Sequence, residues 1–453
     1  MMEGRLSHLL TDMSASAAVI AVCGGMRKSR ADFRADVAAN ARRLQQEQCR
    51  RGLLLTEDSY WAAVGLFALL EAGCEIVFPP NGRPGTLEAM SGSFDRLISD
   101  GSSFLANSFH LQSGSLSETP SGRPLDPASP IAFFTSGSTG TAKRIDKCLR
   151  QLEQEAAAIE AVFGAVVPPS ACVHATVSHQ HVYGLSFRLC WPLATGRPFE
   201  GRTHDIWESV MGALEDNDAL VTSPAHLMRL HGLALPVGRR PSLILSAGAP
   251  LDAEAIATTA GVFDIAVTEI FGSTETGAIA WRSHRTAGSG WQPLPGVSIS
   301  ANADDCMVVQ APYVDSQQAS ADLIELLPGG SFHFRGRSDR VVKIEGKRVD
   351  LQQIEQALRG LPWVADAAVI QHEPTRRIAA AVAMTAEGQG RLEQMGAFRF
   401  GRLLQKELSA TLEPVGLPRR WRFVTSLPVA ALGKRRQADI AALFEAAQPE
   451  SVS

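Results

Sequence analysis

The sequence lacks paired cysteines, an excess of positive charge and any long apolar run. Its seven cysteines are dispersed among 453 residues with no C-x-x-C pair, which argues against a disulfide framework or a zinc site and favours a reducing compartment. The net charge of −4 gives no global positive field, so nucleic acid is not an expected partner. The longest apolar stretch, roughly residues 61–70, is far too short to span a bilayer, and no membrane span is expected.

A convincing secretory signal is missing as well. Residues 15–23 form a short apolar run, but the segment before it carries Glu3 and Asp12 as well as Arg5, which makes a poor positively charged leader. We therefore expect residues 15–23 to form a buried strand and the protein to be cytoplasmic.

Two common nucleotide-binding motifs are also absent. The usual phosphate loop needs a second glycine five residues after the first, followed by Lys-Ser or Lys-Thr. Here Ala142 occupies that glycine position and Arg144 follows Lys143. No G-x-G-x-x-G sequence follows a predicted strand, so a Rossmann dinucleotide site has no support either.

A different loop of small polar residues follows a predicted strand at residues 131–134. It consists of Thr135, Ser136, Gly137, Ser138, Thr139, Gly140, Thr141, Ala142 and Lys143. Small residues let the backbone approach a ligand, their amides and hydroxyls can point at phosphate oxygens, and the lysine adds a point charge. The loop predicts a nucleotide triphosphate site, so the chain is expected to use ATP. The alternative is a surface linker, which the strand-like flanks disfavour.

The rest of the chain alternates between helical and strand patterns. Residues 31–48, 60–73 and 149–163 have the pattern of helices, whereas residues 53–55, 75–78, 172–177 and 243–245 read as strands. This alternation predicts an α/β fold with a mostly parallel sheet. From about residue 298 short strands and turns predict a β-rich subdomain, and residues 341–445 predict a small α+β unit. A hydrophobic fraction of 45% over this length suffices for two or three domains.

Further motifs follow the loop in a fixed order. They are His181–Leu185, Ser246–Leu251, Phe271–Glu275, Asp322, Gly336–Asp339, Lys347–Val349 and Gly433-Lys434. Together with the loop they resemble the adenylate-forming superfamily: acyl- and aryl-CoA synthetases, peptide-synthetase adenylation domains and luciferases. The resemblance extends from about residue 15 to 440. It implies an N-terminal adenylation domain at 1–336, a hinge at 337–340 and a small mobile C-terminal domain at 341–453.

The resemblance assigns the nucleotide site. Asp322 stands fifteen residues before Arg337, the family spacing for the aspartate that accepts from both ribose hydroxyls. Phe271 replaces the tyrosine that stacks on adenine. The other implied nucleotide contacts are Gly272, Thr274 at the α-phosphate, and the opposite adenine wall of Gly248, Ala249 and Pro250. Glu275 is the implied Mg²⁺ ligand, since Mg²⁺ keeps few protein ligands beside phosphate oxygens and water.

The resemblance also implies residues for the two chemical steps. Lys434 would bridge carboxylate, ribose oxygen and phosphate while the acid attacks the α-phosphorus. Asp339 would be the hinge about which the C-terminal domain swings, bringing Gly346 in to line a tunnel for the acceptor thiol. His181 would lie at the mouth of the acyl pocket. A zinc pair of His179 and His181 is the alternative, but no third ligand accompanies them.

The expected reaction joins a small carboxylic acid to a thiol at the expense of ATP. Amino-acid-activating relatives carry an aspartate where this chain has His181–Leu185, and a buried ammonium without a partner would be costly, so we expect an acid without an α-amino group. The acceptor would be CoA or the phosphopantetheine arm of an acyl carrier protein. Alternatives are a nucleotide-binding sensor or interaction module that has lost catalysis, and an enzyme that oxidises the adenylate as luciferases do.

Several positions depart from the family pattern. The usual Thr-Gly before the ribose aspartate is Ser320-Ala321, the Pro-Lys-Gly end of the loop is Ala142-Lys143-Arg144, and the later Pro and Glu are Leu351 and Gln353. No charge assigned to the chemistry is removed, so the departures point to a divergent subfamily.

Overall fold

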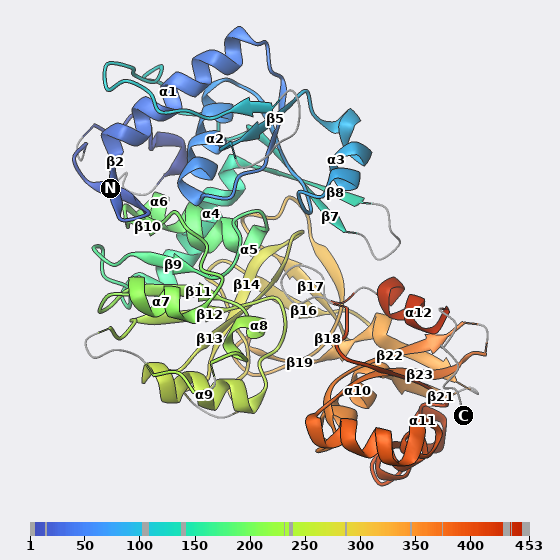
Figure 1. Cartoon of the computed structure of the whole chain (residues 1–453). Helices are drawn as coiled ribbons and strands as arrows, with labels where there is room; N and C mark the ends of the chain where they lie inside the picture. The colour runs from blue at the N-terminus through green and yellow to red at the C-terminus, as the bar shows by residue number, and fades with distance from the viewer. Residues whose placement is uncertain are drawn as a thin grey trace.

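The computed structural model describes residues 5–13, 16–101, 108–136, 142–230, 232–234, 239–285, 288–344, 347–373, 375–428, 435 and 437–445. Figure 1 shows two sheet-containing bodies joined along the N-terminal part of the chain, with the C-terminal residues (orange to red) as a smaller body beside them. No helix in these ranges is both long and apolar enough to cross a membrane.

The first body is a sheet in the order β6-β5-β3-β4-β7-β8. Its strands are β3 (Arg51–Leu54), β4 (Glu75–Phe78), β5 (Arg96–Ser99), β6 (Ser108–His110), β7 (Pro130–Ser136) and β8 (Ala142–Cys148). All neighbours are parallel except β7 and β8, which form an antiparallel pair. The helices that accompany it are α1 (Arg30–Gln46), α2 (Ser59–Glu71) and α3 (Pro84–Ala89). Ser29 and Asp32 form a reciprocal capping box at the start of α1, which satisfies amides that the first turn leaves unpaired.

The second body is a longer sheet in the order β15-β14-β13-β12-β11-β9-β10-β1-β2. Its strands are β1 (Val19–Cys23), β2 (Met26–Ser29), β9 (Val173–Ala175), β10 (Phe199–Glu200), β11 (Ala219–Thr222), β12 (Leu243–Ser246), β13 (Thr268–Ser273), β14 (Gly277–Ser283) and β15 (Gln292–Pro293). Its helical segments are α4 (Leu149–Phe163), α5 (Val182–Gly184), the π-helical η3 (Leu185–Cys190), α6 (Trp191–Thr195), α7 (Trp207–Ala213), α8 (Pro224–Leu227) and α9 (Ala253–Phe263). Six neighbouring strands of this sheet run parallel, in the order β13-β12-β11-β9-β10-β1. The segments after β9, β11, β12 and β13 therefore emerge at one edge of the sheet, where α/β folds place their ligands.

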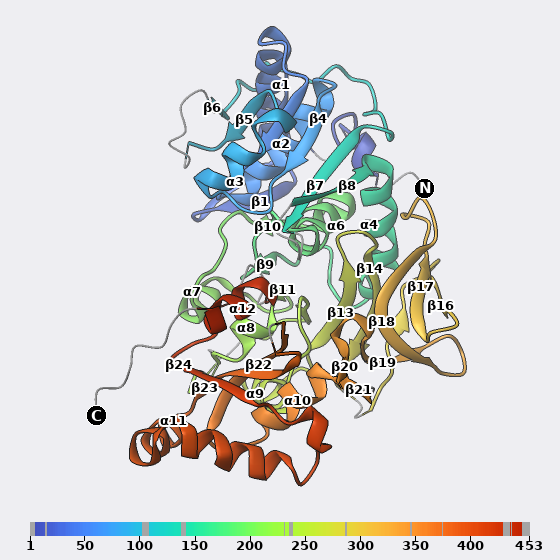
Figure 2. The same ribbon diagram turned by 90° about the vertical axis from the view of Figure 1, so that its right-hand side faces the viewer.

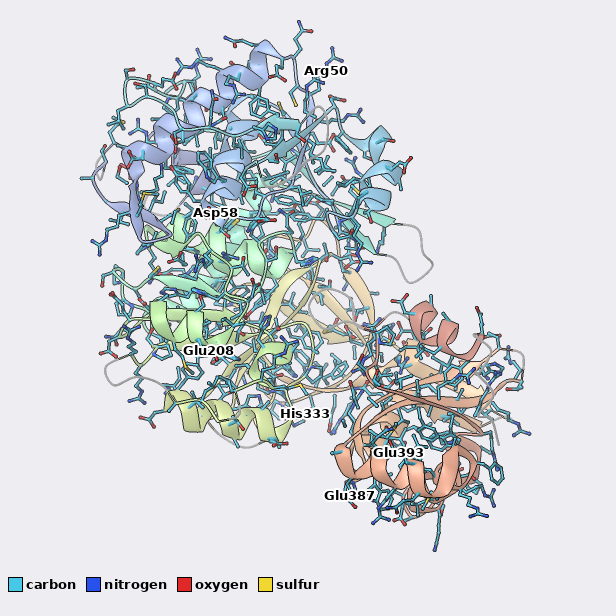
Figure 3. The ribbon with its side chains drawn as sticks, viewed as in Figure 1. Arg50, Asp58, Glu208, His333, Glu387 and Glu393 are labelled. Carbon is cyan, nitrogen blue, oxygen red and sulfur yellow. The ribbon has the colours of Figure 1, made fainter. Side chains whose placement is uncertain are left out.

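One apolar core runs through both bodies, from Leu6 to Tyr313, and includes both faces of α2. Asp58, labelled in Figure 3, caps α2 by accepting from the Tyr60 amide at 2.7 Å. The amide of Ser59, the first residue of α2, donates to the carbonyl of Gly201, just after β10, at 2.8 Å. Helix α2 therefore belongs to the first body and is fastened to the second.

The remaining strands form smaller sheets. An antiparallel sheet in the order β16-β17-β18-β19 consists of β16 (Ser298–Ala301), β17 (Cys306–Gln310), β18 (Gln318–Leu326) and β19 (Phe332–Arg337). Beyond the short turn η4 (Ser338–Arg340) come the hairpin β20 (Val341–Ile344) and β21 (Lys347–Asp350) and the sheet of β22 (Val364–His372), β23 (Arg377–Met384) and β24 (Arg420–Val424). This part also contains α10 (Leu351–Arg359), α11 (Ala386–Leu408) and α12 (Gln437–Glu445).

The C-terminal sheet has apolar clusters of its own on its two faces. Helix α11, which carries Glu387 and Glu393 in Figure 3, lies on the outer side of this unit in both ribbon views (Figures 1 and 2). It is kinked at Gly396, whose φ of 76° lies outside the helical region.

The α/β fold class predicted from the sequence is confirmed, with the β-rich region after residue 298. The helix predicted at 149–163 and the strand predicted at 75–78 have these bounds in the structure.

Candidate active site

Two charged residues predicted to bind the nucleotide meet at the carboxyl edge of the second sheet. Glu275 occupies the tip of the β13–β14 hairpin, and its Oε1 accepts from the Nζ of Lys143 on β8 at 2.8 Å, although 132 residues separate them. Burial acts to raise the pKa of Glu275, but the hydrogen bond and charge of Lys143 outweigh it, and the pKa is lowered. The Lys143 side chain is 61% exposed, so it is free to turn toward a phosphate.

The polar loop begins where β7 ends. Thr135 pairs with Lys143 across β7 and β8, and its hydroxyl donates to the Lys143 carbonyl at 3.5 Å. Ser136 is the last residue of β7. Gly137, Ser138, Thr139 and Gly140 lie outside the described residues, as do Gly346 and Lys434. Their roles remain predictions.

Arg144 stands where relatives carry glycine, and the structure gives it two partners. Its guanidinium donates to Glu75 of β4 at 2.6 Å and to Asp146 of its own strand at 2.7 Å. Both contacts lie on the face of β8 opposite to Lys143, because successive side chains of a strand alternate. Arg144 thus ties β8 to β4 and points away from the predicted phosphate site.

The two predicted adenine walls are joined by a buried carboxylate. Gly248, with a φ of 103°, Ala249 and Pro250 form an exposed loop after β12. The next amide, that of Leu251, donates to Oε1 of Glu269 on β13 at 3.0 Å.

Glu269 is 2% exposed and also accepts from Arg282 and from His284, the latter at 2.6 Å. Burial acts to raise its pKa, but these hydrogen bonds and the Arg282 charge prevail and lower it. Glu269 is not among the residues that the motifs predict. A charged residue within an otherwise apolar strand is the signal that could have pointed to it.

Phe271 lies near the end of β13, within an aromatic cluster. Its ring contacts those of Trp291, Phe332 and Phe334 at centroid distances of 5.1, 5.7 and 5.7 Å. These rings support one side of Phe271, and its stacking on adenine stays a prediction.

The turn after Phe271 is narrow. A Cβ on Gly272 would lie 2.2 Å from the Gly277 carbonyl oxygen, so only glycine fits there. Ser273 and Thr276 close the turn through a hydroxyl–hydroxyl hydrogen bond of 3.1 Å. Thr274 and Glu275 occupy the tip between them.

Asp322, Arg337 and Asp339 form one charged chain at the start of the predicted hinge. Asp322 on β18 is the cross-strand partner of Arg337 on β19, and their Oδ1 and Nη1 atoms lie 2.9 Å apart. The same guanidinium binds both oxygens of Asp339 at 2.9 and 2.7 Å. Burial raises the pKa of Asp322 against the opposing charge of Arg337. The arrangement places the predicted ribose carboxylate and the predicted hinge residue on one arginine.

His181 precedes α5 in the segment after β9 and is partly buried, and its carbonyl accepts from the Leu185 amide at 2.8 Å. His179 is 1% exposed, and its ring nitrogens bond to Ser59 Oγ at 2.8 Å and Thr56 Oγ1 at 3.0 Å. Burial lowers the pKa of His179 to about 3. No group of three potential metal-ligating side chains occurs in the part of the chain that is described.

Strand β8 of the first sheet brings Lys143 to the Glu275 hairpin of the second sheet, and the glycine loop after β12 follows the strand that neighbours β13. A family model described as AMP-binding enzyme matches residues 95–309. A 4-coumarate–CoA ligase from Rhodobacter capsulatus is 29% identical over 312 residues, which are 68% of this chain and 75% of the relative. These matches confirm the resemblance of the chain's motifs to the adenylate-forming superfamily of AMP-binding enzymes.

Solved structures share the fold over almost the whole chain. ATP-bound MatB from Rhodopseudomonas palustris is 18% identical, with a TM-score of 0.81, and the match covers 98% of this chain and 99% of that one. A benzoate CoA ligase from Burkholderia xenovorans LB400 is 18% identical, with a TM-score of 0.76, and the match covers 96% and 99% of the two chains. The fold therefore extends through the C-terminal unit.

Proposed function

We propose that this protein activates a carboxylic acid without an α-amino group as an acyl-adenylate, releases pyrophosphate, and passes the acyl group to a phosphopantetheine thiol. It is an AMP-forming acid–thiol ligase that uses ATP. The observation that carries the proposal is the Lys143–Glu275 contact of 2.8 Å, which joins the polar loop to the carboxylate hairpin in a chain of this superfamily.

In the first step a carboxylate oxygen of the acid attacks the α-phosphorus of ATP, and the bond to the β,γ-pyrophosphate breaks. Both reactants are anions, so cationic groups that offset their repulsion accelerate the step. Lys143 supplies one such charge at the polar loop, and Lys434 is the proposed second. Asp322 accepts from the ribose hydroxyls, and its other neighbour Arg337 keeps it oriented.

Glu275 suits Mg²⁺ as one ligand among phosphate oxygens and water. Its side chain is 36% exposed and already attracts a cation, the Lys143 ammonium. When bound, Mg²⁺ would offset the negative charge of the phosphates. Thr274, beside Glu275 at the hairpin tip, would donate its hydroxyl to a phosphate.

In the second step the acceptor thiolate attacks the acyl carbonyl and AMP leaves. We propose that the unit after Asp339 rotates between the steps, withdrawing Lys434 and bringing Gly346 to the thiol path. The acceptor is CoA or an acyl carrier protein, both of which present the same phosphopantetheine thiol.

An aromatic acid is the preferred substrate class. The names of the 4-coumarate–CoA ligase and benzoate CoA ligase relatives support it. The absence of an aspartate in His181–Leu185 supports an acid without an ammonium group, because a buried ammonium needs a partner.

An ATP–pyrophosphate exchange screen over benzoates, cinnamates and fatty acids tests the proposal. We expect exchange with one acid class, and thioester formation when CoA or a phosphopantetheinylated carrier protein is then added. Exchange with no acid would contradict ligase activity and favour a nucleotide-binding sensor. A product that incorporates oxygen in place of a thioester would favour adenylate oxidation.

A further inference from the structure

Strand β8 presents two lysines on its inner face. Lys143 and Lys147 are four residues apart, so on a strand they share a face, with Ile145 between them. Ile145 is 8% exposed and Lys147 is 5% exposed, whereas Arg144 and Asp146 lie on the outer face and are exposed. A lysine on the buried face of a strand is unusual unless it has a partner.

Both lysines bind Glu275, but at different atoms. Lys143 Nζ lies 2.8 Å from the carboxylate Oε1, whereas Lys147 Nζ donates to the main-chain carbonyl oxygen at 3.1 Å. The first contact is largely exposed and the second is buried. The Glu275 side chain and its backbone are therefore held separately.

The other limb of the hairpin is held by a buried carboxylate. Glu155 on α4 is 2% exposed, and its Oε1 accepts from the Ala278 amide at 2.8 Å. A Cβ on Gly277 would lie 2.8 Å from the same carboxylate, so the hairpin approaches α4 as closely as glycine permits. Burial lowers the pKa of Lys147 and raises the pKa of Glu155, and the opposite charge of each residue opposes the shift of the other.

We propose that Lys147, with Glu155, is a positioning residue for the nucleotide and Mg²⁺ site. It fixes the backbone of the hairpin tip, so that the Glu275 carboxylate stays in place when Lys143 leaves it for the phosphates. A buried charge adds little net stability even near a charge of opposite sign, because desolvation offsets the attraction, so the contribution of these two residues here is the position of the hairpin. The inference rests on the proposed function, because it assigns a task within that site.

The test compares Lys147→Met, which keeps the aliphatic stem and loses the donor, with Lys147→Arg, which keeps a charged donor. Isothermal titration with MgATP in the absence of acid measures binding without turnover. K147M loses a hydrogen bond that a charged group donates, so we expect it to bind MgATP more weakly and to have a KM for ATP about tenfold higher than the wild type. Its KM for the acid should be unchanged. K147R restores part of the loss. Lys406→Met, on an exposed position of α11, is the matched control and leaves both values unchanged.

Hydrogen exchange of residues 273–278 gives a readout independent of activity. We expect the amide hydrogens of these residues to exchange faster in K147M than in the wild type. In Lys143→Met they should exchange at the wild-type rate. If K147M does not fold, Lys147→Gln, whose amide is too short to reach the carbonyl, provides the same comparison. Unchanged MgATP affinity and hairpin exchange would overturn the proposal. A wild-type protein that binds MgATP but exchanges pyrophosphate with no acid would sink the proposed function and leave the binding test of Lys147 valid.

Discussion

Lys143 and Arg144 are adjacent on β8 and have opposite surroundings. Lys143 faces Glu275 at the predicted phosphate site, whereas Arg144 faces Glu75 and Asp146 on the other side of the strand. We expect Lys143→Ala to lower the rate of ATP–pyrophosphate exchange about 10²-fold, as the loss of a preorganised charge at a reacting centre does. Its melting temperature should stay near that of the wild type, because an exposed ion pair contributes about 0–1 kcal/mol.

Arg144→Ala is the matched control for that experiment. It removes two ion pairs from the same strand without touching Glu275, so its exchange rate should stay close to that of the wild type. If both variants lose activity equally, the loss comes from β8 as a whole and the assignment of Lys143 to the phosphates is wrong.

Asp322 offers a test that uses the ligand itself. If its carboxylate accepts from the ribose hydroxyls, the wild type should prefer ATP over 2′-deoxy-ATP, and Asp322→Ala should lose that preference. Because a hydrogen bond to a charged group is strong, we expect KM for the two nucleotides to differ about tenfold in the wild type. This difference should disappear in Asp322→Ala. Steady-state exchange with each nucleotide measures it, and preserved discrimination in the variant would contradict the assignment.

Lowering the pH should have the same effect on ribose binding as the Asp322→Ala substitution. Burial raises the pKa of Asp322 above its ordinary value even though Arg337 opposes the shift. The carboxylate is thus protonated at a higher pH than an exposed aspartate, and its acceptor capacity for the ribose is lost as pH falls through the raised pKa. Asp322→Asn should show no such dependence in its ATP affinity.

At the scale of elements, the β13–β14 hairpin depends on glycine where it touches α4. Gly277 has a φ of 72°, and its missing Cβ would meet the Glu155 carboxylate at 2.8 Å. Gly277→Ala therefore combines a left-handed conformation, which costs about 1–2 kcal/mol for a residue with a Cβ, with a clash against a buried charge. We expect a lower melting temperature and a higher KM for ATP.

Gly261→Ala is the comparison at a permissive site. Gly261 lies within α9, and a Cβ there would meet nothing within 4 Å. Alanine is the better helix former by roughly 1 kcal/mol, so this variant should melt higher with unchanged kinetics. A wild-type KM in Gly277→Ala would show that the hairpin tolerates displacement and would argue against its role in nucleotide binding.

The elements that the sequence predicts well are those whose buried faces are mostly apolar. Helix α4 and strand β4 have clear patterns, and both have their predicted bounds. Strand β8 does not, because Lys147 occupies its buried face and interrupts the alternation of apolar and polar residues. Glu155 and Glu269 escape prediction for the same reason, since a charged residue in a sequence is expected at the surface. The contact between Lys143 and Glu275 spans 132 residues and follows only from the order of family motifs.

At the scale of the molecule, the two N-terminal sheets are joined by a buried histidine. His179 follows β9 of the longer sheet and bonds to Thr56, which lies between β3 and α2 of the other sheet, and to Ser59, the first residue of α2. Burial lowers its pKa from 6.5 to about 3, and burial lowers that of His204 from 6.5 to about 4. Both rings are therefore neutral in the folded protein over most of the acidic range.

The lowered pKa values of these two histidines fix the sign of their own contribution to the pH dependence of stability. Below pH 6.5 the unfolded chain binds a proton at each histidine while the folded chain does not, so the free energy of unfolding falls as pH falls. The loss should accumulate from about pH 6.5 downward, at up to about 1.4 kcal/mol per pH unit for each ring, until the folded pKa values are reached. Urea denaturation at pH 7 and pH 5 should show a lower midpoint at pH 5.

His179→Asn should lower the midpoint at pH 7, because Thr56 and Ser59 lose their partner, yet reduce the difference between pH 7 and pH 5. His333→Gln, at a partly exposed position of β19 (Figure 3), is the control and should keep the wild-type difference. An undiminished pH dependence in His179→Asn would mean that His204 and the carboxylates alone account for the acid sensitivity. The junction between the sheets would then not be the part of the molecule that acid weakens first.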